Sequence, residues 1–283
     1  PSDIAGRIAA EILSAKLGVS VVVENKAGAS GAIAADVVAN SKPDGNTLLV
    51  NVTADIVNPV INRDPKSLIT TRFAPVALIA TAPNVLVVHP SLPVNSAKEL
   101  VEFVRSKKAD NSLSYASAGL GTVSHLSGLL FTSATGASIV HVPYKGTAAA
   151  QVDLLAGRVQ IMFDSLSSGL VNAKSGKVKA LAVTSPKRWP MSPELPTLEE
   201  IGLPETDMMA VFGLLAPAGT PKAIVALLNK EANAVLQLPD VREKLQAQGI
   251  VITGGTVESV ERHIPKEMDK WAQVVKTSQL KFD

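Results

Sequence analysis

The chain has 283 residues, which is long for one compact core and favours about two domains. Hydrophobic residues make up 46% of it and aromatic residues only 4%, so the core must consist of Val, Leu, Ile and Ala, as in helices packed on parallel sheets. The formal net charge is +2 and no basic run occurs, so the sequence gives no support for binding nucleic acid or a membrane surface. Cysteine is absent, which excludes disulfides, zinc ribbons and thiol catalysis.

The first part of the chain is predicted to alternate short helices and strands. Asp3 is expected to be the N-cap of a helix that ends at Gly18, and residues 32–39 are expected to form a second helix. Residues 56–71 are expected to be irregular because they contain two prolines. Strands are predicted at residues 19–23, 47–51, 75–79 and 84–88.

A regular alternation of strands and helices follows, from residue 113 to residue 183. Short turns between the elements imply a parallel sheet that is covered on both faces. The predicted strands are residues 113–116, 139–142, 159–163 and 178–183, and the predicted helices are residues 123–134, 148–156 and 166–174.

The last part begins with a proline-rich stretch at residues 184–204. After it we expect a strand at residues 209–216, a long helix from Pro221, a short helix at 241–248 and a final amphipathic helix. Segments around His89 and around residues 211–215 are interpreted as crossings between two domains. The predicted domains are residues 1–88 with 212–283, and residues 89–211. Two crossings imply a hinge, and a hinged cleft is a usual place for a ligand.

No signal peptide and no apolar run long enough to cross a bilayer occur in the sequence. The chain begins directly on a predicted helix start, which we interpret as the loss of an upstream segment.

The glycine-rich turn at residues 117–124 is the first candidate site. It partly matches a dinucleotide-binding turn, but the acidic residue expected about 20 positions later is missing. An ordinary tight turn is one alternative. The other is capture of a carboxylate by backbone N–H groups together with the hydroxyls of Ser117, Thr122 and Ser124.

Two further candidates lie at predicted strand ends. Tyr144, Lys145 and Gly146 precede a helix, and Lys145 is either an anion-attracting group or a solvated surface charge. Asp164 either accepts a hydrogen bond from a ligand amine or hydroxyl, or caps the next helix.

Catalysis finds little support in the sequence. The four histidines are scattered, and the chain contains no metalloprotease, hydrolase-elbow, Walker or EF-hand motif. His125 lies near Ser124 and Ser127, but we expect it to be a helix residue with a local hydrogen bond. Lys26 and Arg63 are expected to be surface charges.

Ordered blocks over nearly the whole chain resemble a known family. They are VVENKAGASG (22–31), PDGNTLL (43–49), YASAG (115–119), HVPYKG (141–146), MFD (162–164), ALAVT (180–184) and FGLLAPAGTP (212–221). This pattern resembles the substrate-binding receptors of tripartite tricarboxylate transporters, also called Bug receptors.

The resemblance implies a periplasmic receptor with the two-domain, type II Venus flytrap fold, an α/β architecture with two crossover hinge segments. Such a receptor captures a small organic acid in the interdomain cleft and delivers it to a tripartite membrane transporter or a sensor. The ligand would be a dicarboxylate, tricarboxylate, amino acid or aromatic acid, and the partners would be membrane transporter subunits. The resemblance implies a monomer that has no catalytic activity, holds no cofactor or metal and binds no nucleic acid. The alternatives are the effector-binding domain of a transcription regulator and, third, an α/β enzyme.

The resemblance also implies which residues bind the ligand. Phe212 would close the hinge side of the cleft. The ligand-binding positions would be Ser2, Asp3, Thr53, Asp55, Ser117, Ala118, Gly119, Thr122, Ser124, Tyr144, Lys145, Gly146 and Asp164. This sequence departs from the family pattern in lacking the strand and the proline- and glycine-rich loop that precede the first helix.

Overall fold

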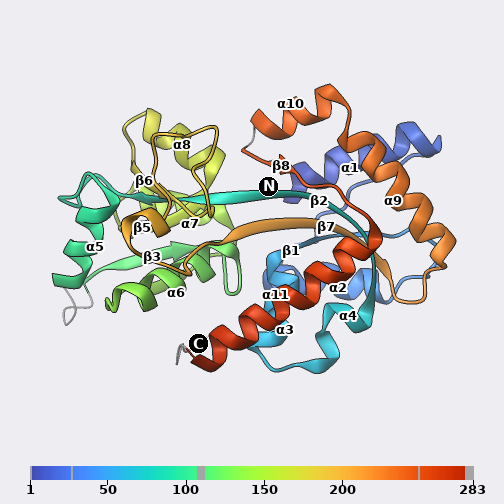
Figure 1. Ribbon diagram of the computed structural model, residues 1–283, viewed down its shortest axis with the longest axis horizontal. Coiled ribbons are helices and arrows are strands. Elements are labelled where there is room, and N and C mark those ends of the chain that lie inside the picture. Colours follow the sequence, from blue (N-terminus) through green and yellow to red (C-terminus); the bar gives the residue numbers. More distant parts are fainter. Residues whose placement is uncertain (1, 27, 107–111, 248, 278–283) are drawn as a thin grey trace. The chain divides into compact units, whose positions relative to one another are not determined.

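The computed structural model describes residues 2–26, 28–106, 112–247 and 249–277, and the chain divides into two compact units. Unit 1 comprises residues 1–81 and 211–283, and unit 2 comprises residues 82–210. The chain passes between the units twice, within the long strand β2 (Phe73–Val88) and within β7 (Met209–Pro217), both visible in Figure 1.

Unit 1 is a small sheet surrounded by helices that come from both ends of the chain. Its strands follow the order β1-β7-β2-β8, in which β1 pairs with β7 and β8 pairs with β2, both antiparallel. The remaining elements of unit 1 are α1 (Ser2–Leu17), α2 (Ala32–Ala39), β1 (Leu49–Val52), α3 (Thr53–Ile61), α4 (Ile69–Arg72), α9 (Lys222–Leu236), α10 (Pro239–Ala247), β8 (Val251–Ile252) and α11 (Val257–Thr277), with short 3-10 turns at Ala29–Gly31 and Pro65–Ser67.

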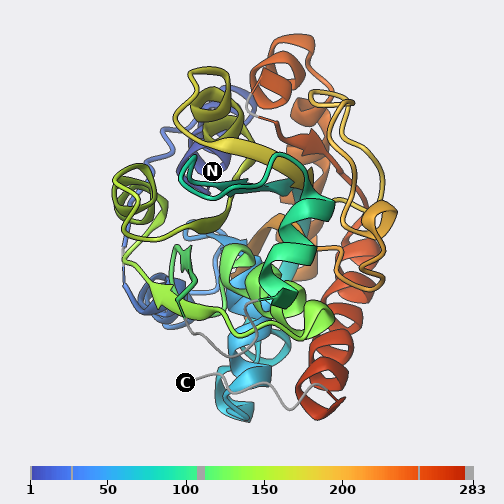
Figure 2. The same ribbon diagram turned by 90° about the vertical axis from the view of Figure 1, so that its left-hand side faces the viewer.

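The core of unit 1 is mostly aliphatic, with a few buried aromatic side chains from β2, β7 and α11. Helix α11 packs along α3, so that the C-terminal helix lies beside a segment from the first quarter of the chain (Figure 2). Trp271 of α11 and Val57 of α3 are completely buried, as are Val76 and Ala77 of β2. Burial of such side chains stabilises the fold by roughly 1.5–3 kcal/mol each.

Unit 2 is a five-stranded sheet with helices on both faces. The strand order is β6-β2-β5-β3-β4, in which β3 is parallel to both β4 and β5, and β2 is antiparallel to β5 and β6. Its own elements are α5 (Ala97–Ser106), β3 (Ser114–Ser117), α6 (Val123–Thr135), β4 (Val140–Pro143), α7 (Thr147–Leu155), β5 (Ile161–Ser165), α8 (Leu166–Lys174), β6 (Lys179–Val183) and a 3-10 turn at Glu199–Ile201.

Two separate hydrophobic clusters cover the faces of this sheet. Leu86 of β2 and Phe163 of β5 point into the cluster that contains Leu100 and Phe131. Val85, Val87 and Met162 belong to the other cluster, together with Leu154 of α7. The alternation of side chains along a strand therefore fills both layers, as a doubly covered sheet requires.

The first part of the chain differs from the sequence prediction in three places. Residues 19–23 do not form a strand, because no other strand pairs with them in the described part of the chain, and Val22 is 78% exposed. Residues 75–79 and 84–88 belong to one strand, β2, in which Pro83 lies between the stretch that pairs with β8 and the stretch that pairs with β5.

The third difference concerns the stretch expected to be irregular. Residues 53–61 form helix α3 with Pro59 inside it. A proline removes one backbone donor, and here its ring is buried in the core, so the packing of α3 outweighs the lost hydrogen bond. Because β2 is continuous, the first crossing lies between residues 81 and 82, ahead of the segment around His89.

Candidate functional site

The C-terminal ends of the three parallel strands β3, β4 and β5 lie side by side in unit 2, and this end of the sheet is called the sheet edge below. In the registers of these strands, Ser117 of β3 pairs with Pro143 of β4, and Ala116 pairs with Met162 of β5. Helices α6, α7 and α8 begin shortly after these strand ends. The first turn of a helix leaves backbone N–H groups without partners and carries a partial positive charge, so this edge favours an anion.

Backbone hydrogen bonds join the two predicted binding turns. The Tyr144 N–H donates to the Ser117 carbonyl at 3.0 Å, and the Gly146 N–H donates to the Ala118 carbonyl at 3.1 Å. Gly119 and Gly146 have φ angles of 130° and 108°, which L side chains rarely adopt. The structure therefore brings residues 117–124 and 144–146 into one place.

Most amides of the glycine-rich turn already have partners. The Ala118 N–H donates to Ser124 Oγ at 3.0 Å, the Gly119 N–H to Ser117 Oγ at 3.2 Å, and the Thr122 N–H to the Gly119 carbonyl at 3.3 Å. The Thr122 hydroxyl also donates to the Gly119 carbonyl at 2.6 Å. The donors that remain for a ligand therefore include those of the first turns of α6 and α7.

The side chains of the second turn point to different surroundings. The Tyr144 hydroxyl donates to Asp153 of α7 at 2.7 Å, and Arg158 donates to the other oxygen of the same carboxylate. Burial and this hydrogen bond raise the pKa of Tyr144 to about 12. Lys145 is exposed. Tyr144 therefore anchors the turn, while Lys145 is the charged group that can attract an anion.

Asp164 is buried at the end of β5 and accepts three hydrogen bonds. Gln151 Nε2 of α7 donates to Oδ2 at 2.8 Å, and the Ser165 N–H and the Ser168 hydroxyl donate to Oδ1 at 2.8 and 3.1 Å. Burial raises the pKa of this carboxyl group, and the three hydrogen bonds oppose that shift. The N-cap of α8 is Ser165, so the interpretation of Asp164 as the N-cap was wrong. Asp164 instead holds Ser165 and Ser168 at the start of α8, and its bond from Gln151 joins α7 to the same strand end.

Unit 1 carries a second group of predicted residues, in the first turn of α3. Asp55 Oδ2 accepts the Val52 N–H at 2.8 Å, and the Thr53 hydroxyl accepts the Val211 N–H at 3.0 Å. Asp55 Oδ1 lies against Gly31, where a Cβ atom would come within 2.8 Å of it. Burial raises the pKa of Asp55 to about 7, and the hydrogen bond from Val52 only partly offsets that shift.

The predicted residues at the N-terminus lie on helix α1. Ser2 begins α1, and Asp3 is inside its first turn, so the expectation that Asp3 is the N-cap was wrong. Its exposed carboxylate accepts hydrogen bonds from Arg7 at 2.9 Å and Asn25 at 2.7 Å, which lower its pKa. Phe212 is buried in β7, in register with Val52.

Residues 5–280 match the family described as "Tripartite tricarboxylate transporter family receptor". The chain belongs to this receptor family. The family resemblance expected from the sequence is therefore confirmed.

Solved relatives show the same fold for nearly the whole receptor. Its fold matches that of R. palustris Rpa4515, solved with adipate, with a TM-score of 0.91 and 37% identity over 98% of this chain and 92% of that one. The periplasmic binding protein BugD gives 0.88 and 34%, covering 99% and 94%. MatC from Rhodopseudomonas palustris, solved with bound malate, gives 0.87 and 32%, covering 97% and 94%. The predicted two-domain, type II binding-protein fold is confirmed.

Sequence reasoning missed several groups that the receptor places at the sheet edge. Gln151, Ser165 and Ser168 hold Asp164, and the imidazoles of His125 and His141 contact the glycine-rich turn. The expectation that His125 makes a local hydrogen bond in a helix is confirmed by its bond from the Gly121 N–H. The contact of His141 with Ser117 depends on the register of β3 and β4, and that of Gln151 with Asp164 depends on how α7 packs, which no local pattern in the sequence reveals. The contacts of Ser165 and Ser168 with Asp164 are local.

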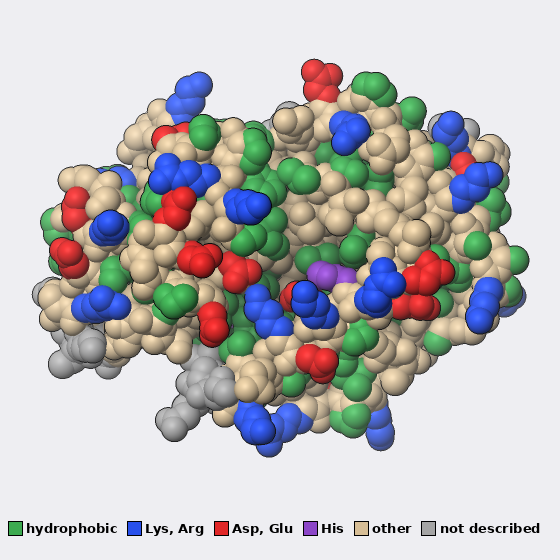
Figure 3. Space-filling model, viewed as in Figure 1, with side chains coloured by type: hydrophobic (Ala, Val, Ile, Leu, Met, Phe, Trp, Pro, Cys, Tyr) green, Lys and Arg blue, Asp and Glu red, His purple; other side chains and the backbone are tan. Residues whose placement is uncertain are grey.

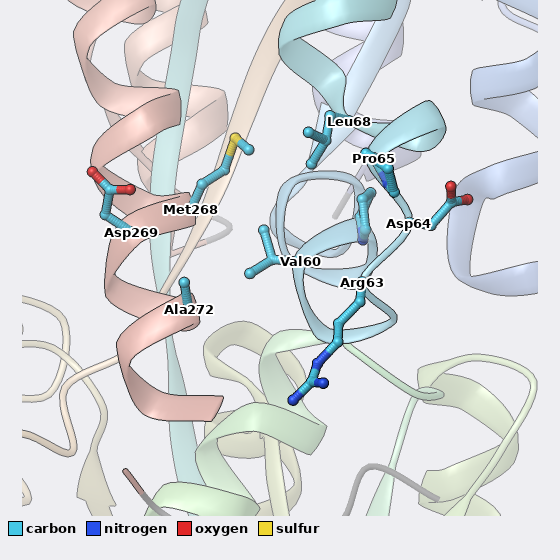
Figure 4. Close-up of a pocket in the computed structure, with 9 residues that line it drawn as sticks. Val60, Arg63, Asp64, Pro65, Leu68, Met268, Asp269 and Ala272 are labelled. Atoms are coloured by element: carbon cyan, nitrogen blue, oxygen red, sulfur yellow. The ribbon is translucent and has the colours of Figure 1, made fainter. Parts of the chain in front are cut away.

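A groove of about 310 Å³ lies elsewhere in unit 1 and contains none of the predicted residues. Figure 4 shows Val60, Leu68, Met268 and Ala272 around it, with Arg63 and Asp269 on opposite sides. It lies between α3 and α11, and none of the predicted ligand-binding residues lines it, so it is not assigned to ligand binding.

Within residues 2–26, 28–106, 112–247 and 249–277, no group of three His, Asp or Glu side chains is placed to hold a metal ion. None of the helices in these ranges has the length and hydropathy of a membrane span. The face in Figure 3 mixes acidic and basic side chains without a large area of one sign.

Proposed function

We propose that this receptor binds a small organic acid and that the sheet edge of unit 2 holds one carboxylate of the ligand. The observation that carries the proposal is the pair of helix N-termini, α6 and α7, whose preceding turns are joined by two backbone hydrogen bonds. Backbone N–H groups in this arrangement recognise an anion without a metal or a cofactor.

Charges near this edge are consistent with an anionic ligand that also carries a polar substituent. Lys145 adds a positive charge beside the first turn of α7. A carboxylate has about four acceptor positions, and three of those on Asp164 are used by Gln151, Ser165 and Ser168. We propose that the remaining position accepts a hydrogen bond from a hydroxyl or amine of the ligand.

We propose a dicarboxylate as the first ligand class to test. Rpa4515 was solved with adipate and MatC with malate, and both share the fold over nearly the whole chain. The other classes are tricarboxylates, amino acids and aromatic acids. In unit 1, Thr53 and Asp55 form a second polar group, and we propose that they contribute to binding as well.

We propose that the receptor works in the periplasm and delivers its ligand to the membrane subunits of a tripartite transporter. This rests on family membership and on the description of BugD as a periplasmic binding protein. We propose binding without chemical conversion, because the histidines and serines at the sheet edge are committed to contacts within the turn.

Calorimetric titration with adipate, succinate, L-malate, citrate, an amino acid and benzoate tests the ligand class. The site is tested by Ala148→Asp, which places a negative charge in the exposed first turn of α7. An acidic residue there stabilises the helix by roughly 0.3–1 kcal/mol and competes with an anionic ligand for the same N–H groups. We expect at least about a tenfold loss of affinity without loss of thermal stability.

The matched control is Ala223→Asp, because Ala223 is the second residue of α9 as Ala148 is of α7, and both are exposed. This control should bind like the wild type. Equal affinities for Ala148→Asp and the wild type would contradict the proposed site, and a wild type that binds none of the acids would contradict the proposed function.

A further inference from the structure

Three aromatic rings are stacked next to the glycine-rich turn. The rings of Tyr115 and His141 are 4.8 Å apart at an interplanar angle of 23°, and those of His141 and His125 are 4.2 Å apart at 24°. They come from β3 and β4, which lead into the two turns, and from α6, which follows the first turn. Gly128 of α6 makes room for the stack, because a Cβ atom there would overlap the Tyr115 ring.

Each imidazole in the stack makes one hydrogen bond to the turn. His125 Nδ1 accepts the Gly121 N–H at 2.9 Å. His141 Nε2 is 2.7 Å from Ser117 Oγ, which in turn accepts the Gly119 N–H at 3.2 Å. Gly121 and Gly119, whose φ angles are both positive, are thus fixed by one histidine each, directly or through Ser117.

The bond from Gly121 requires a particular state of His125. A backbone N–H can only donate, so Nδ1 must be bare and the proton of the neutral ring must be on Nε2. Burial lowers the pKa of His125 to about 3, with His141 adding to the shift, and burial lowers the pKa of His141 to about 4. Both rings are therefore neutral at pH 7.

We infer that His125 and His141 are positioning residues for ligand binding, which act by fixing the two glycines of the turn through these hydrogen bonds. The inference rests on the proposed function, since it concerns the same sheet edge. The rings do not touch the ligand; they set the direction of the turn that leads into α6, and with it the direction of the α6 donors.

Asparagine and glutamine variants separate the hydrogen bond from the ring. Asparagine places an oxygen near the position of Nδ1, and glutamine places its amide near that of Nε2. His125→Asn and His141→Gln therefore keep the contact to the turn, whereas His125→Gln and His141→Asn lose it. All four variants lose the ring stacking, so the comparison within each position isolates the hydrogen bond.

Dicarboxylate affinity is measured by calorimetry for all four variants. His125→Asn and His141→Gln should bind within about threefold of each other, and His125→Gln and His141→Asn roughly tenfold more weakly, as expected for a lost hydrogen bond that leaves a donor unpaired. His89→Asn and His89→Gln are controls, because His89 contacts Ser91 and not the turn, and they should not differ. Equal affinities within both the His125 and the His141 pairs would overturn the inference.

A second readout needs no ligand. In ¹⁵N spectra, His125 should show a bare Nδ1 and a protonated Nε2. The Gly121 amide proton should exchange with solvent faster in His125→Gln than in His125→Asn. Equal exchange rates would overturn the inference even if the wild type bound none of the acids, in which case the proposed function would fail separately.

Discussion

Two acidic residues, one in each unit, differ in how many hydrogen bonds their carboxylates accept. Asp164 of unit 2 lies at a strand end with three donors on its carboxylate. Asp55 of unit 1 lies in the first turn of α3, and among the described residues only the Val52 N–H donates to it. Burial raises the pKa of both. Three hydrogen bonds oppose the shift at Asp164, whereas one opposes it at Asp55, whose pKa reaches about 7.

The difference shows that burial alone does not determine how a carboxylate behaves. Three donors stabilise the charged form of Asp164, so it is a fixed acceptor that helps to hold β5, α7 and α8 together. Asp55 has too few donors to hold its charge firmly, so it can gain or lose a proton near neutral pH.

The largest effect is expected for Asp164→Ala. This change leaves the Gln151 amide, the Ser165 N–H and the Ser168 hydroxyl without their acceptor, and it should lower the free energy of unfolding by roughly 3 kcal/mol. Urea unfolding measures it. Asp64→Ala is the control, since Asp64 also accepts a backbone N–H and a serine hydroxyl but lies on the surface, and it should cost about 1 kcal/mol or less.

The same variant tests the proposed ligand contact of Asp164. We expect Asp164→Ala to weaken binding of L-malate much more than binding of succinate, because the two acids differ only by a hydroxyl group. Calorimetry with both ligands gives the two losses in affinity. Equal losses would leave Asp164 with a structural role alone, as the acceptor for Gln151, Ser165 and Ser168.

Asp55→Asn should have the next largest effect on the free energy of unfolding, and the size of this effect depends on pH. The native pKa of about 7 lies above the ordinary value of 3.8, so the native state holds the proton more tightly than the unfolded state does. Stability is therefore lost as pH rises from about 4 to about 7 and does not return above that range. The neutral amide removes this loss, so the variant should be more stable than wild type by roughly 2 kcal/mol at pH 8 and similar at pH 4. Wild-type and variant curves that stay parallel from pH 4 to 8 would contradict the shift.

A smaller effect is expected on the protons exchanged during binding. If a ligand carboxylate contacts Asp55, it favours the protonated form, so binding takes up protons and affinity falls above pH 7 by up to about tenfold per pH unit. Titrations in two buffers with different ionisation enthalpies count the protons. Asp55→Asn should show no uptake, and wild-type heats that are the same in both buffers would remove Asp55 from the site.

Lys145→Ala should have the smallest effect. Lys145 is exposed, so solvent and salt screen its attraction for an anion. We expect about a threefold loss of affinity at low ionic strength, vanishing near ~0.5 M salt. A loss that persists in high salt would show direct contact with the ligand.

The sequence was most informative where structure is local. The alternation over residues 113–183 predicted all the strands and helices of that segment, because apolar strands and helix-forming segments there are separated by clear turns. The expectation of a parallel sheet was only partly right, because β2 comes from outside this segment and runs antiparallel to β5 and β6. Helix α8 was predicted with the same bounds, Leu166–Lys174. In the first part of the chain, residues 19–23 have the composition of a strand, but a strand needs a partner, and composition does not show whether one exists.

The candidate site was likewise predictable where its contacts are local and unpredictable where they depend on packing between distant segments. The turns at 117–124 and 144–146 were predictable from glycine and strand ends, and so was the contact of His125 with Gly121, four residues away. The contact of His141 with Ser117 depends on the register of β3 and β4, and that of Gln151 with Asp164 on how α7 packs. The single donor on Asp55 follows from packing that brings Gly31 against its other oxygen.

The two backbone hydrogen bonds that join the turns of unit 2 have a consequence for molecular evolution. The anion-binding donors there belong to the main chain, and a main-chain N–H is the same whatever side chain it carries. Uncharged substitutions at exposed positions such as Ala148 and Ala149 can therefore accumulate without removing these donors, whereas an acidic side chain there competes with the ligand for them. Divergence toward different acids should accordingly be recorded in the side chains that meet the rest of the ligand, while the grip itself persists in sequences that have otherwise drifted apart.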